Sequence, residues 1–168
     1  MQERCVYNLS MDNFDKMKTE DLWSYYSKIV IELRRRKAIR TRNVTGERGE
    51  QLAIAFYNNE KGIPKLQAAP EGTKNVDALS RSGDRYAIKT IMEPNRTTGV
   101  FYGITEDPDQ TPKFEYLIVV ILDNLYQLKQ VLELDWKTFL MYKKWHSRMG
   151  AFNISLTKDL LKQAIVRY

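Results

Sequence analysis

GTKNVDALSRSGDRYAIKT, residues 72–90, is the stretch that decides the fold of this 168-residue chain. Two strand-like runs, 76–80 and 85–91, flank Ser82-Gly83-Asp84, and short Gly-containing turns between such runs predict a β-hairpin. A three-residue loop would place Asp77 directly opposite Lys89, and opposed residues share a face of the sheet. The stretch therefore predicts a hairpin from which an acid and a lysine emerge side by side.

The segments on either side of the hairpin complete an α/β pattern. Further strands are expected at 65–68, 114–122 and 126–132, and helices at 19–37, 46–57, 135–145 and 158–166. The continuous apolar run at 114–122 indicates a central strand covered on both faces. On the helix at 46–57, the expected buried residues are Leu52, Ala55 and Phe56. Helices first, a mixed sheet in the middle and helices last predict an α/β sandwich.

The length is that of about one domain, so residues 1–168 are expected to form a single domain. Residues 1–16 lack periodicity and are interpreted as an arm or a short turn of helix. The helix at 19–37 is expected to precede the core, with Thr19 as its N-cap. The last helix is expected to be capped by Thr157.

Composition narrows the class of protein. Hydrophobic residues make up 43% and charged residues 29%, which argues against wholesale disorder. The longest apolar run, 116–122, is too short to span a bilayer, and residues 1–9 contain no secretory h-region. We therefore expect a cytoplasmic location and no membrane partner. The net charge of +6 favours polyanionic partners, although charge alone is weak support for nucleic-acid binding.

The pair Asp77 and Lys89 has two readings. Phosphodiester hydrolysis uses a carboxylate to hold a hard cation and an ammonium group to stabilise developing negative charge. The alternative is a cross-strand salt bridge on a solvated face. Glu47 and Glu50 favour the first reading, because they share one helical face behind Gly46. A first-turn acid is also a routine helix-dipole feature, which explains Glu47 well and Glu50 less well.

The order of these pieces resembles that of the PD-(D/E)XK nuclease superfamily, and more narrowly its small bacterial restriction-endonuclease-like members. The matching pieces, over about residues 18–160, are Glu-Leu-Arg-Arg-Arg at 32–36, Arg-Thr-Arg-Asn at 40–43, Gly-Glu-x-x-Glu at 46–50, the stretch 72–77, and Ala-Ile-Lys-Thr at 87–90. Each motif is short and degenerate, so their order is more specific than any one of them. The resemblance implies a restriction-endonuclease-like mixed β-sheet flanked by helices.

The resemblance also implies roles for particular residues. Asp77 would be the first metal ligand, Lys89 the motif lysine, and Glu50, with Glu47 as second choice, the helix acid that binds metal through water. The main-chain carbonyl of Ile88 would be a further ligand, and the metal would be Mg²⁺, with Mn²⁺ as the alternative.

One position departs from the family pattern. Related sequences carry Glu, Asp or Gln where this chain has Ala87, which has no side-chain ligand. Three explanations stay open: a site with fewer ligands, a degenerate homologue, or an engineered inactive form.

Two segments are candidates for DNA contacts. Arg40, Arg42 and Asn43 lie in the link before the acidic helix, and arginine there can face a phosphate backbone. Asn95, Arg96 and Thr97 follow the lysine strand, and Asn and Arg can contact adenine and guanine edges. A simply solvated loop explains the second segment about equally well.

These observations support three hypotheses. The first is a metal-dependent endonuclease that hydrolyses DNA phosphodiester bonds, with a restriction enzyme as a special case. The second is a catalytically inactive nucleic-acid-binding module of the same fold, which Ala87 favours. The third is a nuclease that acts on RNA. Duplex DNA is the expected partner, and a homodimer is a candidate assembly for which the sequence shows no interface.

Overall fold

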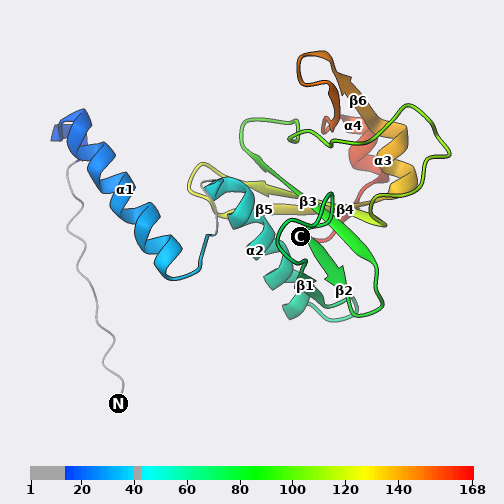
Figure 1. Cartoon of the computed structure of the whole chain (residues 1–168), viewed down its shortest axis with the longest axis horizontal. Coiled ribbons are helices and arrows are strands. Elements are labelled where there is room, and N and C mark those ends of the chain that lie inside the picture. The colour runs from blue at the N-terminus through cyan, green and yellow to red at the C-terminus, as the bar shows by residue number, and fades with distance from the viewer. Residues whose placement is uncertain (1–13, 40–42) are drawn as a thin grey trace. The chain divides into compact units, whose positions relative to one another are not determined.

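The computed structural model describes residues 14–39 and 43–168 (Figure 1). The chain divides into two compact units, Met1–Arg42 and Asn43–Tyr168, which are described separately. The expectation of one domain over 1–168 stays a prediction.

The N-terminal unit consists of a short 3-10 helix, Phe14–Lys16, and helix α1, Thr19–Arg35. This confirms the helix predicted at 19–37, but its N-cap is Lys18, without a side-chain hydrogen bond, and not Thr19. Of the predicted arm, residues 1–13 lie outside the described residues. Within the described parts of the chain, no helix is long and apolar enough to cross a membrane.

The second unit is built on a six-stranded mixed sheet of order β1-β2-β3-β4-β5-β8. Its strands are β1 Leu66–Ala68, β2 Ala78–Ser80, β3 Arg85–Met92, β4 Tyr116–Leu122, β5 Leu128–Asp135 and β8 Ile165–Val166. Strands β3 and β4 are parallel, and every other neighbouring pair is antiparallel. The expectation of an α/β fold with helices around a mixed sheet is confirmed, and β4 is the buried inner strand that its apolar run predicted.

Helix α2, Val44–Asn59, covers one face of the sheet, called here the α2 face (Figure 1). Its core joins Ala53 and Tyr57 to Ile88 and Val120. The predicted buried set was partly wrong, since Ala55 is exposed and the fully buried positions are Ala53 and Tyr57. The rotation of the helix follows from Gly49, which sits directly against Thr90 of β3.

The opposite face, called the α3 face, is covered by helices and a small hairpin. These elements are α3 Trp136–Tyr142, β6 Lys143–His146, the 3-10 helix Ser147–Met149, β7 Ala151–Ile154 and α4 Lys158–Gln163. Phe139 and Phe152 pack there with Ala87 and Leu117. The helix predicted at 135–145 is wrong beyond Tyr142, because the chain turns into β6 and Trp145 pairs with Phe152 across the hairpin.

Candidate functional site

The hairpin predicted from residues 72–90 is present, but its register differs from the prediction. Ala78 pairs with Tyr86 and Leu79 with Arg85, so the position opposite Asp77 is that of Ala87 and not of Lys89. The loop contains four residues, 81–84, instead of three. A two-residue shift leaves every side chain on its predicted face, whereas a one-residue shift would reverse it.

Hydrogen bonds within the turn explain this register. The Ser80 hydroxyl donates to Asp84 Oδ2 at 2.9 Å and the Ser82 hydroxyl at 2.6 Å, while Ser80 N–H donates to the Asp84 carbonyl at 2.9 Å. Gly83 has a φ of +94°, a left-handed conformation that other residues rarely adopt. The two hydroxyl donors hold the pKa of Asp84 below its ordinary value. Asp84 is therefore a turn residue.

Asp77 lies just before β2, where β2 and β3 separate. Its Oδ2 accepts a hydrogen bond from Ile88 N–H at 2.7 Å, and its own N–H donates to the Tyr86 carbonyl at 2.8 Å. The N–H and C=O of one residue in an extended strand point to the same edge. The Ile88 carbonyl therefore faces the Asp77 side, so two kinds of oxygen donor meet at this point of the sheet.

Lys89 belongs to the α3 face. Its neighbours at every second position of β3, Ala87 and Ile91, pack into the core of the α3 face. The Nζ of Lys89 lies 5.1 Å from the centroid of the Phe101 ring. Among the carboxylates of residues 14–39 and 43–168, none forms a salt bridge with Lys89. The simple cross-strand salt bridge with Asp77 is thus not formed, and a cation–π contact holds the ammonium group instead.

Glu47 and Glu50 belong to α2 and hence to the other face. Gly49 between them lies against Thr90, where a Cβ on the glycine would fall 1.9 Å from Thr90 Oγ1. Glu47 is buried and Glu50 half-buried. The expectation that one of these carboxylates joins Asp77 and Lys89 meets an obstacle, because α2 packs on the face that carries Ile88 rather than Lys89.

The donor set for Mg²⁺ is therefore limited. No group of three or more Asp, Glu, His or Cys side chains capable of holding a metal occurs among the described residues. Asp77 and the Ile88 carbonyl offer oxygen ligands, which Mg²⁺ prefers, and such sites add substrate phosphates to one or two carboxylates. Ala87, 1% exposed beside Asp77, contributes none. The residues present therefore fit Mg²⁺ only in part. A phosphate oxygen or another side chain would have to complete the set of ligands.

The predicted DNA-contacting residues have different outcomes. Arg40 and Arg42 lie outside the described residues. Asn43 caps α2, with its Oδ1 accepting from Gly46 N–H at 3.2 Å. The Arg96 guanidinium donates to the Leu156 carbonyl through Nε at 3.2 Å and Nη2 at 2.9 Å.

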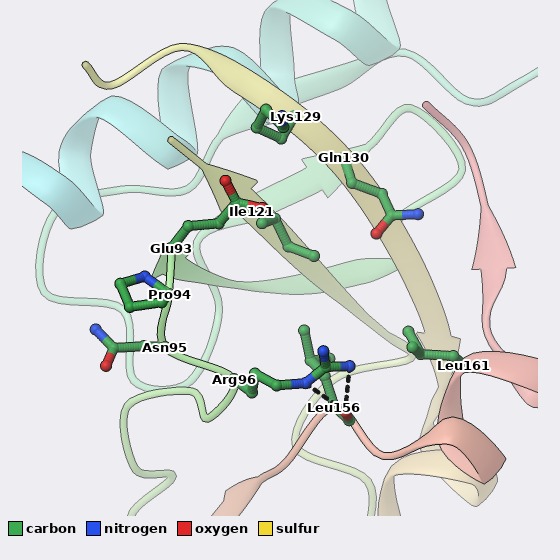
Figure 2. Close-up of a pocket in the computed structure, with 9 residues that line it drawn as sticks. All are labelled: Glu93, Pro94, Asn95, Arg96, Ile121, Lys129, Gln130, Leu156 and Leu161. Carbon is green, nitrogen blue, oxygen red and sulfur yellow. Dashed lines mark hydrogen bonds between the residues drawn. The ribbon is translucent and has the colours of Figure 1, made fainter. Parts of the chain in front are cut away.

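Thr97 pairs with Ser155, and Asn95 lines a surface hollow (Figure 2). The loop 95–97 is therefore held against residues 155–156 rather than simply solvated.

A buried polar network on the α2 face was missed in the sequence. The Tyr57 hydroxyl donates to Glu133, whose carboxylate also pairs with Arg167 at 2.8 Å. Burial, reinforced by Glu133, raises the pKa of Tyr57 well above its ordinary value, and Glu133 raises that of Arg167. The network ties α2, β5 and the C-terminal residues together. An acid between the apolar residues Leu132 and Leu134 of β5 was the sequence feature that could have indicated it.

Comparison with known proteins adds no family to this description. Neither a protein-family model nor a curated protein matches the chain.

Proposed function

We propose that this chain is a metal-dependent endonuclease of the PD-(D/E)XK type, which acts on duplex DNA in the cytoplasm and requires an acid or amide at position 87 for full activity. The observation that carries the proposal is the placement of Asp77. Asp77 lies where β2 and β3 separate, and its carboxylate accepts a hydrogen bond from Ile88 N–H at 2.7 Å. The residue opposite Asp77 on β3 is Ala87, and Lys89 lies two residues further along the same strand. The motif order supports the same class.

The chain's own residues would divide the work as follows. The second oxygen of Asp77 and the Ile88 carbonyl would hold Mg²⁺ or Mn²⁺ together with a phosphate oxygen. A metal bound there supplies Lewis-acid polarisation of the phosphate and a lower pKa for its water. Lys89 would leave the Phe101 ring and stabilise negative charge that develops on the phosphate. Glu50, or Glu47 as second choice, would orient solvent from the α2 side.

A second candidate, a binding module without activity, is favoured by Ala87. Its side chain is 1% exposed and packs into the apolar core of the α3 face. With Ala87 present, the position opposite Asp77 supplies no second carboxylate, and a single carboxylate holds Mg²⁺ loosely. In this reading the basic charge of the chain binds the phosphate backbone and no hydrolysis follows.

Substitution at position 87 separates the two candidates. The chain, Ala87→Gln and Ala87→Glu are incubated with plasmid and phage DNA in Mg²⁺ or Mn²⁺, and cleavage and DNA affinity are measured on the same preparations. Nuclease function predicts that Gln or Glu raises cleavage by orders of magnitude with little change in affinity, as expected for a contribution made in the transition state. Far-UV circular dichroism confirms that each variant is folded. Ala87→Gln is the milder variant, because a buried uncharged amide is less costly than a carboxylate.

The control is the double variant Ala87→Gln with Lys89→Met, which keeps the restored ligand and removes the ammonium group. It is expected to bind DNA and to lose the gained activity. No cleavage by any folded variant, with DNA binding intact, would establish the binding-module reading. RNA in a parallel reaction tests the choice of nucleic acid, and sedimentation of the protein–DNA complex tests whether two copies act together as a homodimer.

A further inference from the structure

A hollow of about 490 Å³ lies at the carboxyl ends of the parallel strands β3 and β4 (Figure 2). It is formed by the segment 93–96 after β3, by Ile121 of β4, by the start of β5, and by Leu156 and Leu161. Crevices outside the carboxyl ends of parallel strands are preferred ligand sites in α/β sheets. The volume also falls within the range of small-molecule sites, about 300–1,000 Å³.

The hollow has an apolar floor and a polar rim. The floor consists of Ile121, Leu156 and Leu161, which belong to the core of the α3 face or pack against it. Lys129 and Gln130, near the start of β5, lie on the rim. An apolar surface with a few convergent polar groups suits a flat ligand that carries hydrogen-bonding groups at its edge.

The rest of the rim is held in place by main-chain and side-chain bonds. Glu93 N–H donates to the Leu122 carbonyl at 2.9 Å, which fixes Glu93 to the end of β4. Arg96 is fixed to Leu156 at three points, since its carbonyl accepts from Leu156 N–H at 2.7 Å and its Nε and Nη2 donate to the Leu156 carbonyl. Three of the five guanidinium donors remain for a ligand. The Arg96 guanidinium and the main chain of Glu93 are thus ordered before any ligand arrives.

We propose that this hollow is a binding pocket for a single unpaired nucleotide, with a preference for guanine. The base would lie on the apolar floor, and its phosphate would bind the cations of Arg96 and Lys129. Glu93 supplies a carboxylate, which accepts hydrogen bonds and donates none. Guanine presents adjacent ring N–H and amino donors to such a group, whereas thymine presents one N–H between two carbonyl oxygens.

The pocket lies close to the candidate catalytic position. Ile121 pairs with Ile91, which is two residues along β3 from Lys89 and on the same face. Strand spacing and rise place the floor about 8 Å from the Lys89 position. The inference extends the proposed function to the recognition of a neighbouring nucleotide, but it concerns binding alone and stands or falls without any hydrolysis.

The test is methyl NMR of the full chain, labelled at Ile and Leu, titrated with dGMP, dAMP, dCMP and dTMP without divalent metal. We expect shifts of Ile121, Leu156 and Leu161, with dGMP binding most tightly. Glu93→Gln should weaken dGMP about tenfold, the usual size of a charge-assisted hydrogen bond, and leave dTMP unchanged. Lys129→Gln should weaken all four nucleotides. The matched control Lys137→Gln, an exposed lysine on α3 outside the lining, should change nothing.

Several results would overturn the proposal. One is the absence of shifts at the three floor residues with every nucleotide. Another is equal affinity for dGMP and inorganic phosphate, which would mean an anion site without base recognition. A third is an unchanged dGMP affinity in folded Glu93→Gln and Lys129→Gln. Plasmid cleavage by the position-87 variants is measured separately, so failure of nucleotide binding and failure of the nuclease proposal are distinguishable.

Discussion

Replacement of Gly49 by alanine tests whether the close approach of α2 to β3 is a requirement of the fold. An alanine Cβ at this position would meet Thr90 Oγ1 at 1.9 Å and both Thr90 Cβ and Cγ2 at 2.9 Å. Rotation of the threonine side chain cannot relieve the contact with Thr90 Cβ. The helix therefore has to move away from the strand, and the core between Ala53 and Ile88 loosens with it.

Two opposing effects set the size of the change. Overpacking of a well-packed contact costs about 1–3 kcal/mol. We take the upper end, ~3 kcal/mol, because backbone has to shift and not only a side-chain tip. Alanine gains about 1 kcal/mol over glycine inside a helix. Gly49→Ala is therefore expected to lower the free energy of unfolding by about 2 kcal/mol.

Urea unfolding of the single and double variants forms the assay. Thr90→Ala removes Oγ1 and Cγ2 but keeps Cβ, so the cost of Gly49→Ala should fall without vanishing, with a coupling of about 1 kcal/mol. Thr90 Oγ1 is buried and has no hydrogen-bond partner among residues 14–39 and 43–168, so Thr90→Ala alone should cost less than a usual core truncation. If Gly49→Ala proves as stable as the parent, or costs the same in both backgrounds, the packing argument is wrong.

Two further predictions concern pH. Because the pKa of Tyr57 is raised in the folded chain, the unfolded chain loses the phenolic proton at a lower pH than the folded chain does. The free energy of unfolding should therefore fall as pH rises above about 10. Tyr57→Phe should reduce that fall, measured by urea titrations at about pH 9–11. The Arg85 pairing at 2.6 Å lowers the pKa of Glu115, so this pair stabilises above the unfolded value of about 4.3 and its contribution is lost as pH falls below it. Arg85→Gln should therefore reduce the acid sensitivity between pH 5 and 3, and an unchanged acid midpoint would contradict this.

Much of the fold could be predicted because its strongest elements carry local patterns. The apolar run 116–122 had to be an inner strand, and the spacing of apolar residues indicated α1 and α2. The small hairpin of β6 and β7 could not be predicted, because Trp136, Phe139 and Tyr142 continue a helical period up to its start. Its formation depends on Trp145 meeting Phe152, a contact that exists only in the folded chain.

For the candidate site, the sequence could suggest residues, but it predicted their arrangement only in part. The face of the sheet on which Lys89 lies could be predicted, because side chains alternate between the two faces and a register shift of two residues leaves each on the same face. The register itself depended on the hydroxyl groups of Ser80 and Ser82 selecting a four-residue loop, which no periodicity encodes. The rim of the hollow could not be predicted from the sequence. Glu93 and Lys129 line the same hollow only because β4 pairs with both β3 and β5.

The short strand β8 has a consequence for the solution behaviour of the chain. Ile165 and Val166 occupy the open edge of β5, Arg167 N–H donates to the Val131 carbonyl at 2.8 Å, and Val131 N–H donates to that of Tyr168 at 3.1 Å. Uncovered sheet edges recruit strands from other molecules. Loss of residues 165–168 would uncover such an edge and would leave Glu133 without Arg167, so proteolytic trimming of these four residues is expected to increase self-association of the chain.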